Sequence, residues 1–402
     1  MKFKAVFVFY SALLGFGVGI VSELFLVAVN FLIHLIWYTA PQALHLPSFY
    51  PIIIGLIGGV LVGLSQKYIG PFPKTLHETL TEFKMTQSVT YEHRILRNLI
   101  SSLIVLGFGA SLGPEAALSS ILGGLITWIG DRLKLTLAKK ELLLNLGIGA
   151  MMSTIFHAPF WGITKPVENE LDKGHIAVKG KKVGLYTLTT LCGIMGFFYT
   201  KRFFPQETVF AIRIPDIDWD ARVILTILPA LVIGMSFGYF FLWSEKLSQK
   251  WMAKIKSQMI RALLAGLGIG LLGIISYQFL FSGEHELLPL SEDYTSLSVV
   301  ALLVLAFGKT LLTHLCFAGG WRGGKIFPAI LASATIGFTF VSIFPYTPGL
   351  IVGIIVAASI TVILQKPLLT ATLLLLLLPL QFFPAVLITC FLTQKLTQKI
   401  TK

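Results

Sequence analysis

"GASLGPEAAL" at residues 109–118 interrupts a long apolar run that extends over residues 98–130. The stretch contains a proline, a glutamate and two glycines where a membrane helix would otherwise continue. Proline fits the first turn of a helix, because its missing N–H would have no intrahelical partner there. We therefore expect one helix to end before this stretch. A new helix should begin within the segment formed by Gly113, Pro114 and Glu115.

Apolar runs of this kind recur along the whole chain. The 402 residues are 55% hydrophobic and only 13% charged, and the mean hydropathy is +0.81. A helix needs about 20 apolar residues to cross a bilayer. The runs occupy residues 6–40, 51–66, 98–130, 141–163, 183–200, 223–243, 262–282, 297–317, 326–344 and 349–392. They predict roughly ten to fourteen helical segments in an all-α polytopic membrane protein, with residues 1–402 as a single transmembrane domain.

The net charge of +13 follows the membrane edges. Basic residues gather at 132–140, 173–182, 246–261 and 395–402, whereas acidic residues gather at 215–220 and 283–293. This asymmetry predicts a multi-pass protein of the cell membrane with both termini in the cytoplasm. No soluble segment is long enough for a nucleic-acid surface, so no nucleic-acid partner is expected. Three scattered cysteines lack ligand-like spacing, and neither a metal nor a cofactor is expected.

The two halves of the chain resemble each other. The connection at 201–221 divides it into half-repeats of residues 1–205 and 206–402. "GPEAALSSILGG" (113–124) resembles "FPAILASATIGF" (327–338), and "AMMSTIFHAP" (150–159) resembles "ASITVILQKP" (358–367). Interrupted helices at matching positions indicate a transport site. The alternative is that small residues recur in any membrane bundle because they allow close packing.

Helix starts that follow glycine and proline can bind anions. Their first N–H groups lack intrahelical partners and the helix dipole adds positive potential. "GPFPKTL" (70–76) and "GGKIFPAI" (323–330) have the same composition as the stretch at 109–118. Three such starts could converge and replace the hydration shell of a small anion. The candidate anion-binding residues are Gly70, Pro71, Phe72, Gly113, Pro114, Lys325, Ile326 and Phe327.

"GASLGPEA", "HAPFWGI" and "GGWRGGKIFPAIL" together resemble three signature segments of the CLC family of chloride channels and chloride/proton antiporters. The resemblance extends from about residue 50 to residue 392, with the segments in the family's order. It implies two antiparallel half-repeats with interrupted, tilted helices. It also implies a homodimer with one pore per subunit, surrounded by membrane lipid, and anions held by helix N-termini.

Several positions depart from the family's pattern. The family's gating glutamate precedes the Gly-Pro pair, where this chain has Leu112, whereas Glu115 follows the pair. The inner glutamate of proton-coupled members falls at Asn169, between Glu168 and Glu170. The segment at 70–73 lacks the usual serine. The resemblance therefore indicates a divergent, minimal bacterial-type member, expected to lack cytoplasmic regulatory domains.

Two charged residues have alternative interpretations. Glu115 could stabilise the start of its own helix, or it could act as a gate that occupies the anion site until it is protonated. Lys325 could raise the local anion concentration, or it could pair with Glu115. With Leu112 at the family's gating position, we favour Glu115 as the gate.

The expected function is transport of a small inorganic anion, most simply chloride. A channel is slightly favoured over a proton-coupled antiporter, because positions 112 and 169 lack carboxylates. A fluoride-selective transporter is the alternative within the class. Outside it, an intramembrane enzyme acting on lipid phosphates could use Asp216, Asp218 and Asp220 to hold Mg²⁺. A solvated loop explains these aspartates better, so no enzymatic activity is expected.

Overall fold

The computed structural model describes residues 5–70, 73–86, 94–133, 135–171, 180–204, 212, 219–375 and 377–400. Within these ranges the chain is helical, and no strand occurs apart from one isolated bridge. In the described part of the chain, eight helices are long and apolar enough to cross a membrane, and shorter apolar helices accompany them. The molecule is a multi-pass membrane protein with an all-α fold, as expected, although it contains more helices than the apolar runs predict.

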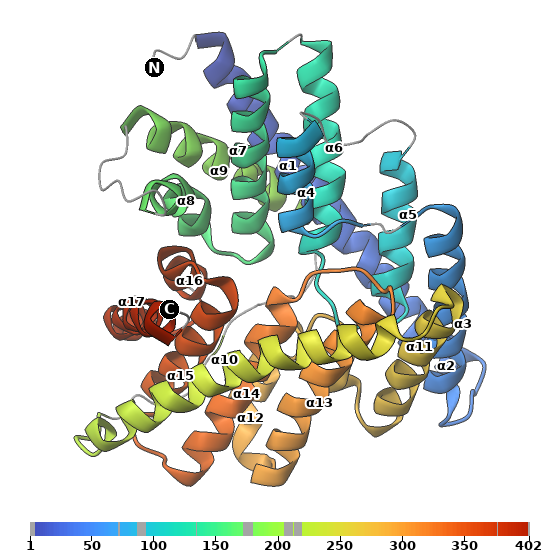
Figure 1. Ribbon diagram of the computed structural model, residues 1–402, viewed down its shortest axis with the longest axis vertical. Coiled ribbons are helices and arrows are strands. Elements are labelled where there is room, and N and C mark those ends of the chain that lie inside the picture. Colours follow the sequence, from blue (N-terminus) through green and yellow to red (C-terminus); the bar gives the residue numbers. More distant parts are fainter. Residues whose placement is uncertain are drawn as a thin grey trace.

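The helices of the first half lie mostly in the upper part of Figure 1 and those of the second half mostly in the lower part. The first half contains α1 (Ala5–His34), a π-helical turn (Leu35–Thr39), α2 (Ala40–Ala43), α3 (Tyr50–Tyr68), α4 (Leu76–Thr86), α5 (Arg94–Gly107), α6 (Glu115–Arg132), α7 (Leu137–Ile155), α8 (Pro159–Leu171) and α9 (Gly180–Lys201). The second half contains α10 (Val223–Ala253), α11 (Gln258–Ile275), α12 (Leu287–Asp293), α13 (Val299–Ala318), α14 (Ile326–Ile343), α15 (Pro348–Leu364), α16 (Pro367–Leu374) and α17 (Phe383–Ile400). Short 3₁₀ turns occur at Tyr277–Phe279, Tyr294–Ser296 and Leu380–Phe382.

The run at 98–130 is broken where the sequence predicts it. α5 ends at Gly107, whose carbonyl oxygen accepts a hydrogen bond of 3.0 Å from Nε1 of Trp37. Gly109 has a φ of +88°, a conformation that glycine adopts without steric cost. α6 begins at Glu115, directly after Pro114. The break therefore combines a capped helix end, a glycine turn and a proline-started helix.

A second kind of break has the same geometry in both halves. His157 and Gln365 have φ values of +50° and +56°, and each lies two residues before the proline that begins the next helix. The hydroxyls of Thr164 and Thr372, which are 208 residues apart, lie 3.1 Å from each other where α8 packs against α16. His157 and Gln365 are separated in the chain by the same 208 residues as Thr164 and Thr372, whose hydroxyls lie next to each other.

Helices α3 and α11 cross at reciprocal glycine contacts. A Cβ added to Gly55 would lie 2.1 Å from the carbonyl oxygen of Gly266, and a Cβ added to Gly266 would lie 2.1 Å from that of Gly55. Likewise, a Cβ added to Gly59 would lie 2.9 Å from the carbonyl oxygen of Ala262, and a Cβ added to Gly270 would lie 2.4 Å from Cα of Ile52. Residue numbers rise along α3 as they fall along α11, so the helices are antiparallel. Segments that are related by a twofold axis make reciprocal contacts of this kind.

The register of the resemblance between the halves differs from the expected one at α6 and α14. These helices begin at Glu115 and Ile326, 211 residues apart. The alignment of Pro114 with Pro328 therefore differs by three residues from the separation of the two helix starts. Pro114 precedes its helix, whereas Pro328 is the third residue of α14. Proline is tolerated at both positions, since neither N–H would have an intrahelical acceptor.

Candidate functional site

The starts of α6 and α14 are joined by a reciprocal pair of backbone hydrogen bonds. Gly113 N donates to Gly324 O and Gly324 N donates to Gly113 O, both at 2.8 Å. The helices run away from this point in different directions, one in each half of the molecule (Figure 1). Both helix N-termini therefore face one small volume of space, as the glycine–proline pattern predicts.

The Glu115 side chain occupies that volume. Its Oε1 accepts a hydrogen bond of 2.9 Å from the backbone N–H of Ile326, the first residue of α14. The residue is 3% exposed, and its buried Oε2 has no hydrogen-bond partner among the described residues. A residue in the first turn of one helix therefore places its carboxyl group at the N-terminus of another.

Two glycines leave the space that this carboxyl group fills. A Cβ added to Gly324 would lie 1.7 Å from Cδ of Glu115, and a Cβ added to Gly113 would lie 2.1 Å from its Oε2. No heavy atom could be tolerated at either distance. This space, bounded by Gly113 and Gly324 and called the cradle below, therefore matches the carboxyl group in size.

An apolar wall closes one side of the cradle. Phe327 is fully buried, and its ring stacks on that of Phe156 with centroids 4.0 Å apart. Leu112, at the family's gating position, is also fully buried, and it lies against Gly323. Leu112 offers no group that could titrate or bind an anion, so Glu115 and not Leu112 supplies the carboxyl group between the two helix starts.

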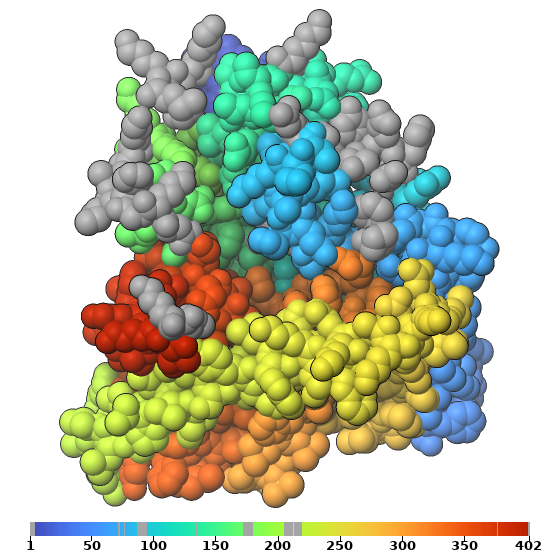
Figure 2. Space-filling model, in the orientation of Figure 1, coloured from blue at the N-terminus to red at the C-terminus, as the bar shows by residue number. Residues whose placement is uncertain are grey.

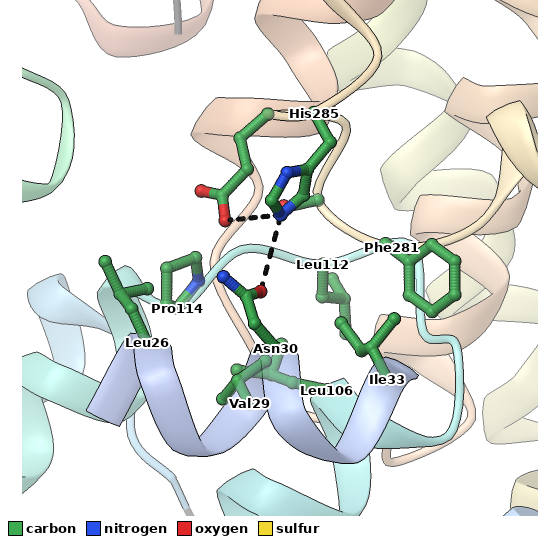
Figure 3. A pocket seen from close by; sticks show the side chains of 11 residues that line it. Leu26, Val29, Asn30, Ile33, Leu106, Leu112, Pro114, Phe281 and His285 are labelled. Atoms are coloured by element: carbon green, nitrogen blue, oxygen red, sulfur yellow. Dashed lines mark hydrogen bonds and ion pairs between the residues drawn. The ribbon is translucent and has the colours of Figure 1, made fainter. Parts of the chain in front are cut away.

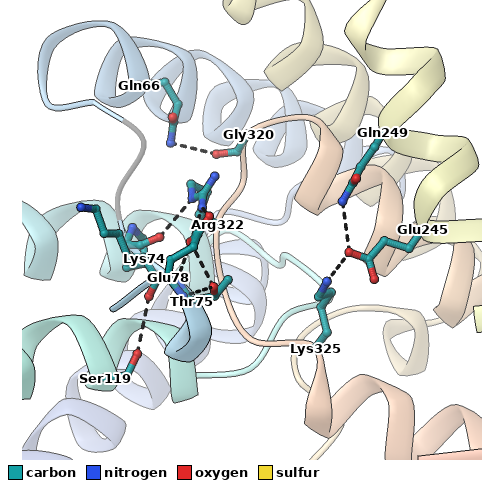
Figure 4. A network of polar contacts seen from close by, with 11 residues as sticks. Gln66, Lys74, Thr75, Glu78, Ser119, Glu245, Gln249, Gly320, Arg322 and Lys325 are labelled. Carbon is teal, nitrogen blue, oxygen red and sulfur yellow. Dashed lines mark hydrogen bonds and ion pairs between the residues drawn. The ribbon is translucent and has the colours of Figure 1, made fainter. Parts of the chain in front are cut away.

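Lys325 does not pair with Glu115. Its Nζ contacts Oε1 of Glu245 on α10 and lies 4.4 Å from the centroid of the Phe317 ring (Figure 4). The alternative in which Lys325 pairs with Glu115 is therefore wrong. Arg322, three residues earlier, contacts Glu78 on α4 and donates to Pro73 O at 3.1 Å. These two ion pairs hold the segment before α14 from both sides.

The third expected helix start differs from the other two. Pro71 and Phe72 lie outside the described residues, and Gly70 adopts a φ of +104°. Thr75 and Glu78 form a reciprocal cap at the start of α4, in which Thr75 N donates to Glu78 Oε2 at 2.7 Å and Glu78 N donates to Thr75 Oγ1 at 3.3 Å. These two donors are thereby engaged within the helix start itself.

A second buried carboxyl group lies at another helix start. Glu168 on α8 is 1% exposed, and its Oε2 accepts a hydrogen bond of 2.8 Å from the backbone N–H of Leu369 in the first turn of α16. The resemblance assigns the family's inner position to Asn169, with Glu168 as its neighbour in the chain. The proline that begins α16 at residue 367 was the signal that a carboxylate could cap this helix.

A small cavity of about 20 Å³ lies beside the break (Figure 3). Pro114, Leu112, Asn30, Glu284 and His285 are among its lining residues. Nε2 of His285 lies 3.3 Å from Oδ1 of Asn30 and 3.6 Å from Oε1 of Glu284. In the sequence, Glu284 and His285 belong to the acidic connection at 283–293, which does not by itself indicate a place beside the break.

The aspartates at 216–220 do not form a metal site that the structure describes. Asp216 and Asp218 lie outside the described residues, whereas Asp220 pairs with Arg222 at 2.7 Å on the surface. No cluster of metal-ligating side chains occurs in the described part of the chain.

Interrupted helices whose ends meet near the contact between two halves of a chain are typical of membrane transport proteins. The family model described as voltage gated chloride channel matches residues 58–398. The chain belongs to this family, the CLC family. It is a transport protein and not an enzyme.

Relatives and solved structures agree with this assignment. YfeO of Escherichia coli O1:K1, which is named as an ion-transport protein, is 28% identical over 363 residues, covering 83% of this chain and 80% of YfeO. YfeO of Salmonella newport is 26% identical over 347 residues, covering 80% and 77%. A slow cyanobacterial Cl⁻/H⁺ antiporter has a TM-score of 0.81 at 18% identity, over 100% of this chain and 96% of the other. A CLC-type fluoride/proton antiporter has a TM-score of 0.78 at 16% identity, over 99% and 98%.

Proposed function

We propose that this protein exchanges a small inorganic anion, chloride foremost, for protons. The anion would bind between the starts of α6 and α14, where the Glu115 carboxyl group now lies. The hydrogen bond from Ile326 N to Glu115 Oε1 is the observation on which this proposal depends. A carboxylate is a tethered anion, so a site that holds a carboxylate with helix-start N–H groups has the chemistry to hold chloride.

The cradle also supports release of the bound anion. It uses backbone N–H groups and partial helix charges, and the nearest cation in the segment, Lys325, is paired with Glu245. Partial charges bind an anion more weakly than a full cation does, and a transport site must release what it binds. Protonation of Glu115 would cancel its charge and free the two helix starts for an anion.

Proton exchange is favoured over a channel by the two buried carboxyl groups. The channel interpretation depended on the absence of carboxylates at positions 112 and 169. Glu115 and Glu168 provide buried carboxyl groups at neighbouring positions, each accepting a hydrogen bond at the start of a helix in the other half. Because these two carboxyl groups lie at different positions in the protein, a proton can bind at each of them in turn. The two solved neighbours that couple an anion to protons agree with this proposal.

We further propose the assembly and orientation that the sequence predicts. Residues 1–205 and 206–402 would form two inverted half-repeats, a proposal supported by the reciprocal contacts between α3 and α11. Two copies would form a dimer in the cell membrane, each copy with its own pathway and with both termini in the cytoplasm. Cross-linking of the reconstituted protein tests the dimer, and labelling of cysteines introduced near each end tests the orientation.

A flux measurement tests the proposed exchange. Liposomes containing the purified protein are loaded with chloride, bromide, nitrate or fluoride, and anion efflux and internal pH are recorded together. We expect chloride to move with an opposite flow of protons that can be driven uphill by the anion gradient. Chloride flux without proton movement would instead support a channel. A preference for fluoride would support the fluoride-selective alternative, which the missing serine at 70–73 raised.

A further inference from the structure

The connection between α11 and α13 brings a titratable pair to the cavity beside the proposed anion site. Glu284 and His285 line this cavity together with Pro114, the residue before Glu115. In Figure 3 the side chain of His285 points towards Asn30 of α1. The pair therefore lies next to the break, on a segment that is distant from the break in sequence.

A buried lysine fixes the position of this connection. Nζ of Lys309 on α13 donates to the carbonyl oxygens of Gln278, Leu280 and Phe281 at 3.3, 2.5 and 2.8 Å. Phe281 N also donates to Gly109 O at 3.4 Å, within the break before α6. The backbone that precedes Glu284 is thereby held against both α13 and the break.

The two members of the pair differ in exposure. The side chain of His285 is 42% exposed, whereas that of Glu284 is 12% exposed. The cavity volume of about 20 Å³ is enough for one water molecule, and the cavity wall offers polar atoms from Asn30, Ser282, Glu284 and His285. The cavity therefore connects these polar groups, beginning with the exposed imidazole, to Pro114, the residue before Glu115.

Mainly acidic groups face Glu284 from the elements around it. Glu23 faces it from α1, Glu115 from α6, and His285 is its neighbour in the connection. His34 faces His285, and Lys309 faces Glu286. Burial, followed by the charges of Glu115 and Glu23, raises the pKa of Glu284 to about 7. A carboxyl group in this position can both accept and release a proton near neutral pH.

We propose that Glu284 transfers protons between the aqueous surface at His285 and the carboxyl group of Glu115. This inference rests on the proposed function. A proton from solution binds the Glu284 carboxylate beside His285, passes through one water molecule of the cavity, and binds the Glu115 carboxylate. Glu284 is then ionised again, and the reverse sequence returns the proton to solution. His285 and Asn30 act as positioning residues at the outer end.

The experiment compares variants of the full chain in liposomes. Chloride efflux and proton uptake are measured together from pH 5 to pH 8. We expect Glu284→Gln to lower the maximal proton flux at least tenfold, and Glu284→Asp to restore much of it, because aspartate keeps the carboxyl group. Glu292→Gln is the matched control, since Glu292 is an exposed acid in the same connection. It should leave both fluxes unchanged.

A purely electrostatic role would give a different result. If Glu284 only repels Glu115, Glu284→Gln would move the midpoint of the pH profile and leave the maximal proton flux as in the wild type, which would overturn the transfer role. If Glu284→Gln does not fold, His285→Gln should slow proton flux several-fold, and an unchanged rate would overturn the proposal. Wild-type protein that moves chloride without protons would overturn both this inference and the proposed exchange, whereas intact exchange in Glu284→Gln would overturn this inference alone.

Discussion

Gly113 and Gly324, which belong to different halves of the chain, exchange two backbone hydrogen bonds of 2.8 Å. Each glycine directly precedes the segment that opens a helix, so the paired backbones bring the starts of α6 and α14 together. The carboxyl group of Glu115 fills the space next to both glycines. Two helix starts and one tethered anion thus meet at a contact between the halves, which is where interrupted helices of transport proteins form their sites.

Gly324→Ala should displace Glu115 from its cradle. The new Cβ would lie 1.7 Å from Cδ of Glu115, so the carboxyl group would have to rotate away. We expect the pH dependence of the anion flux to weaken, and the maximal flux to fall because the new methyl group partly fills the proposed anion site. Gly17→Ala is the control, because a Cβ at Gly17 would meet no atom within 4 Å. A Gly324→Ala protein that folds and keeps the wild-type pH profile would show that Glu115 does not block the site.

Gly55→Ala and Gly266→Ala should each destabilise the protein. Either Cβ would lie 2.1 Å from the partner's carbonyl oxygen, so α3 and α11 would have to separate. Overpacking of this kind costs about 1–3 kcal/mol or more. The melting temperature in detergent should fall by a similar amount for both variants, and Gly184→Ala, which faces open space, should have little effect. A large difference between the two variants would contradict the reciprocal contact.

The Lys325–Glu245 ion pair should be detectable in a double-mutant cycle. The two side chains are 23% and 18% exposed. We therefore expect a coupling of about 1–2 kcal/mol, between the values of exposed and buried pairs. Unfolding is measured for Lys325→Met, Glu245→Met and the double variant. The absence of coupling would indicate that Lys325 keeps an independent charge, and Lys325→Gln should then lower anion flux at low ionic strength.

Stability should depend on the ionisation of Glu284. Burial, followed by the charges of Glu115 and Glu23, raises the pKa of this carboxyl group from 4.5 to about 7 in the folded protein. The unfolded state then loses its proton first, so the stabilisation is fully present below about pH 4.5 and is lost as pH rises towards 7. Over this range the contribution is up to about 3 kcal/mol, at about 1.4 kcal/mol for each pKa unit.

Thermal melting from pH 5 to pH 8 measures this contribution. The wild type should lose melting temperature through this window, and Glu284→Gln should lose less. Equal pH dependence in the two proteins would mean that Glu284 titrates normally. Glu292→Gln, at an exposed position, again provides the control.

The sequence predicts the fold class and the broken helices because both depend on local composition. Apolar runs identify a membrane protein, and glycine followed by proline identifies the start of α6. The sequence also predicts that the starts near Gly113 and Lys325 belong to one site. Side-chain partners are less predictable, because they depend on how distant helices pack. Lys325 pairs with Glu245 on a helix that had no assigned part in the site, and Glu284 reaches the cavity through a connection held by Lys309.

The pH dependence of anion flux in Glu115→Gln tests the central claim most directly. Glutamine keeps the shape of the side chain and removes its charge, so it cannot compete with chloride as a carboxylate does. Flux is measured in liposomes from pH 5 to pH 8 for the wild type and the variant, with equal amounts of folded protein. We predict that the wild-type flux rises as pH falls, and that Glu115→Gln has a high flux at neutral pH that no longer changes with pH. A variant that keeps the wild-type pH profile, with only a lower melting temperature, would contradict the claim and leave Glu115 as a helix cap.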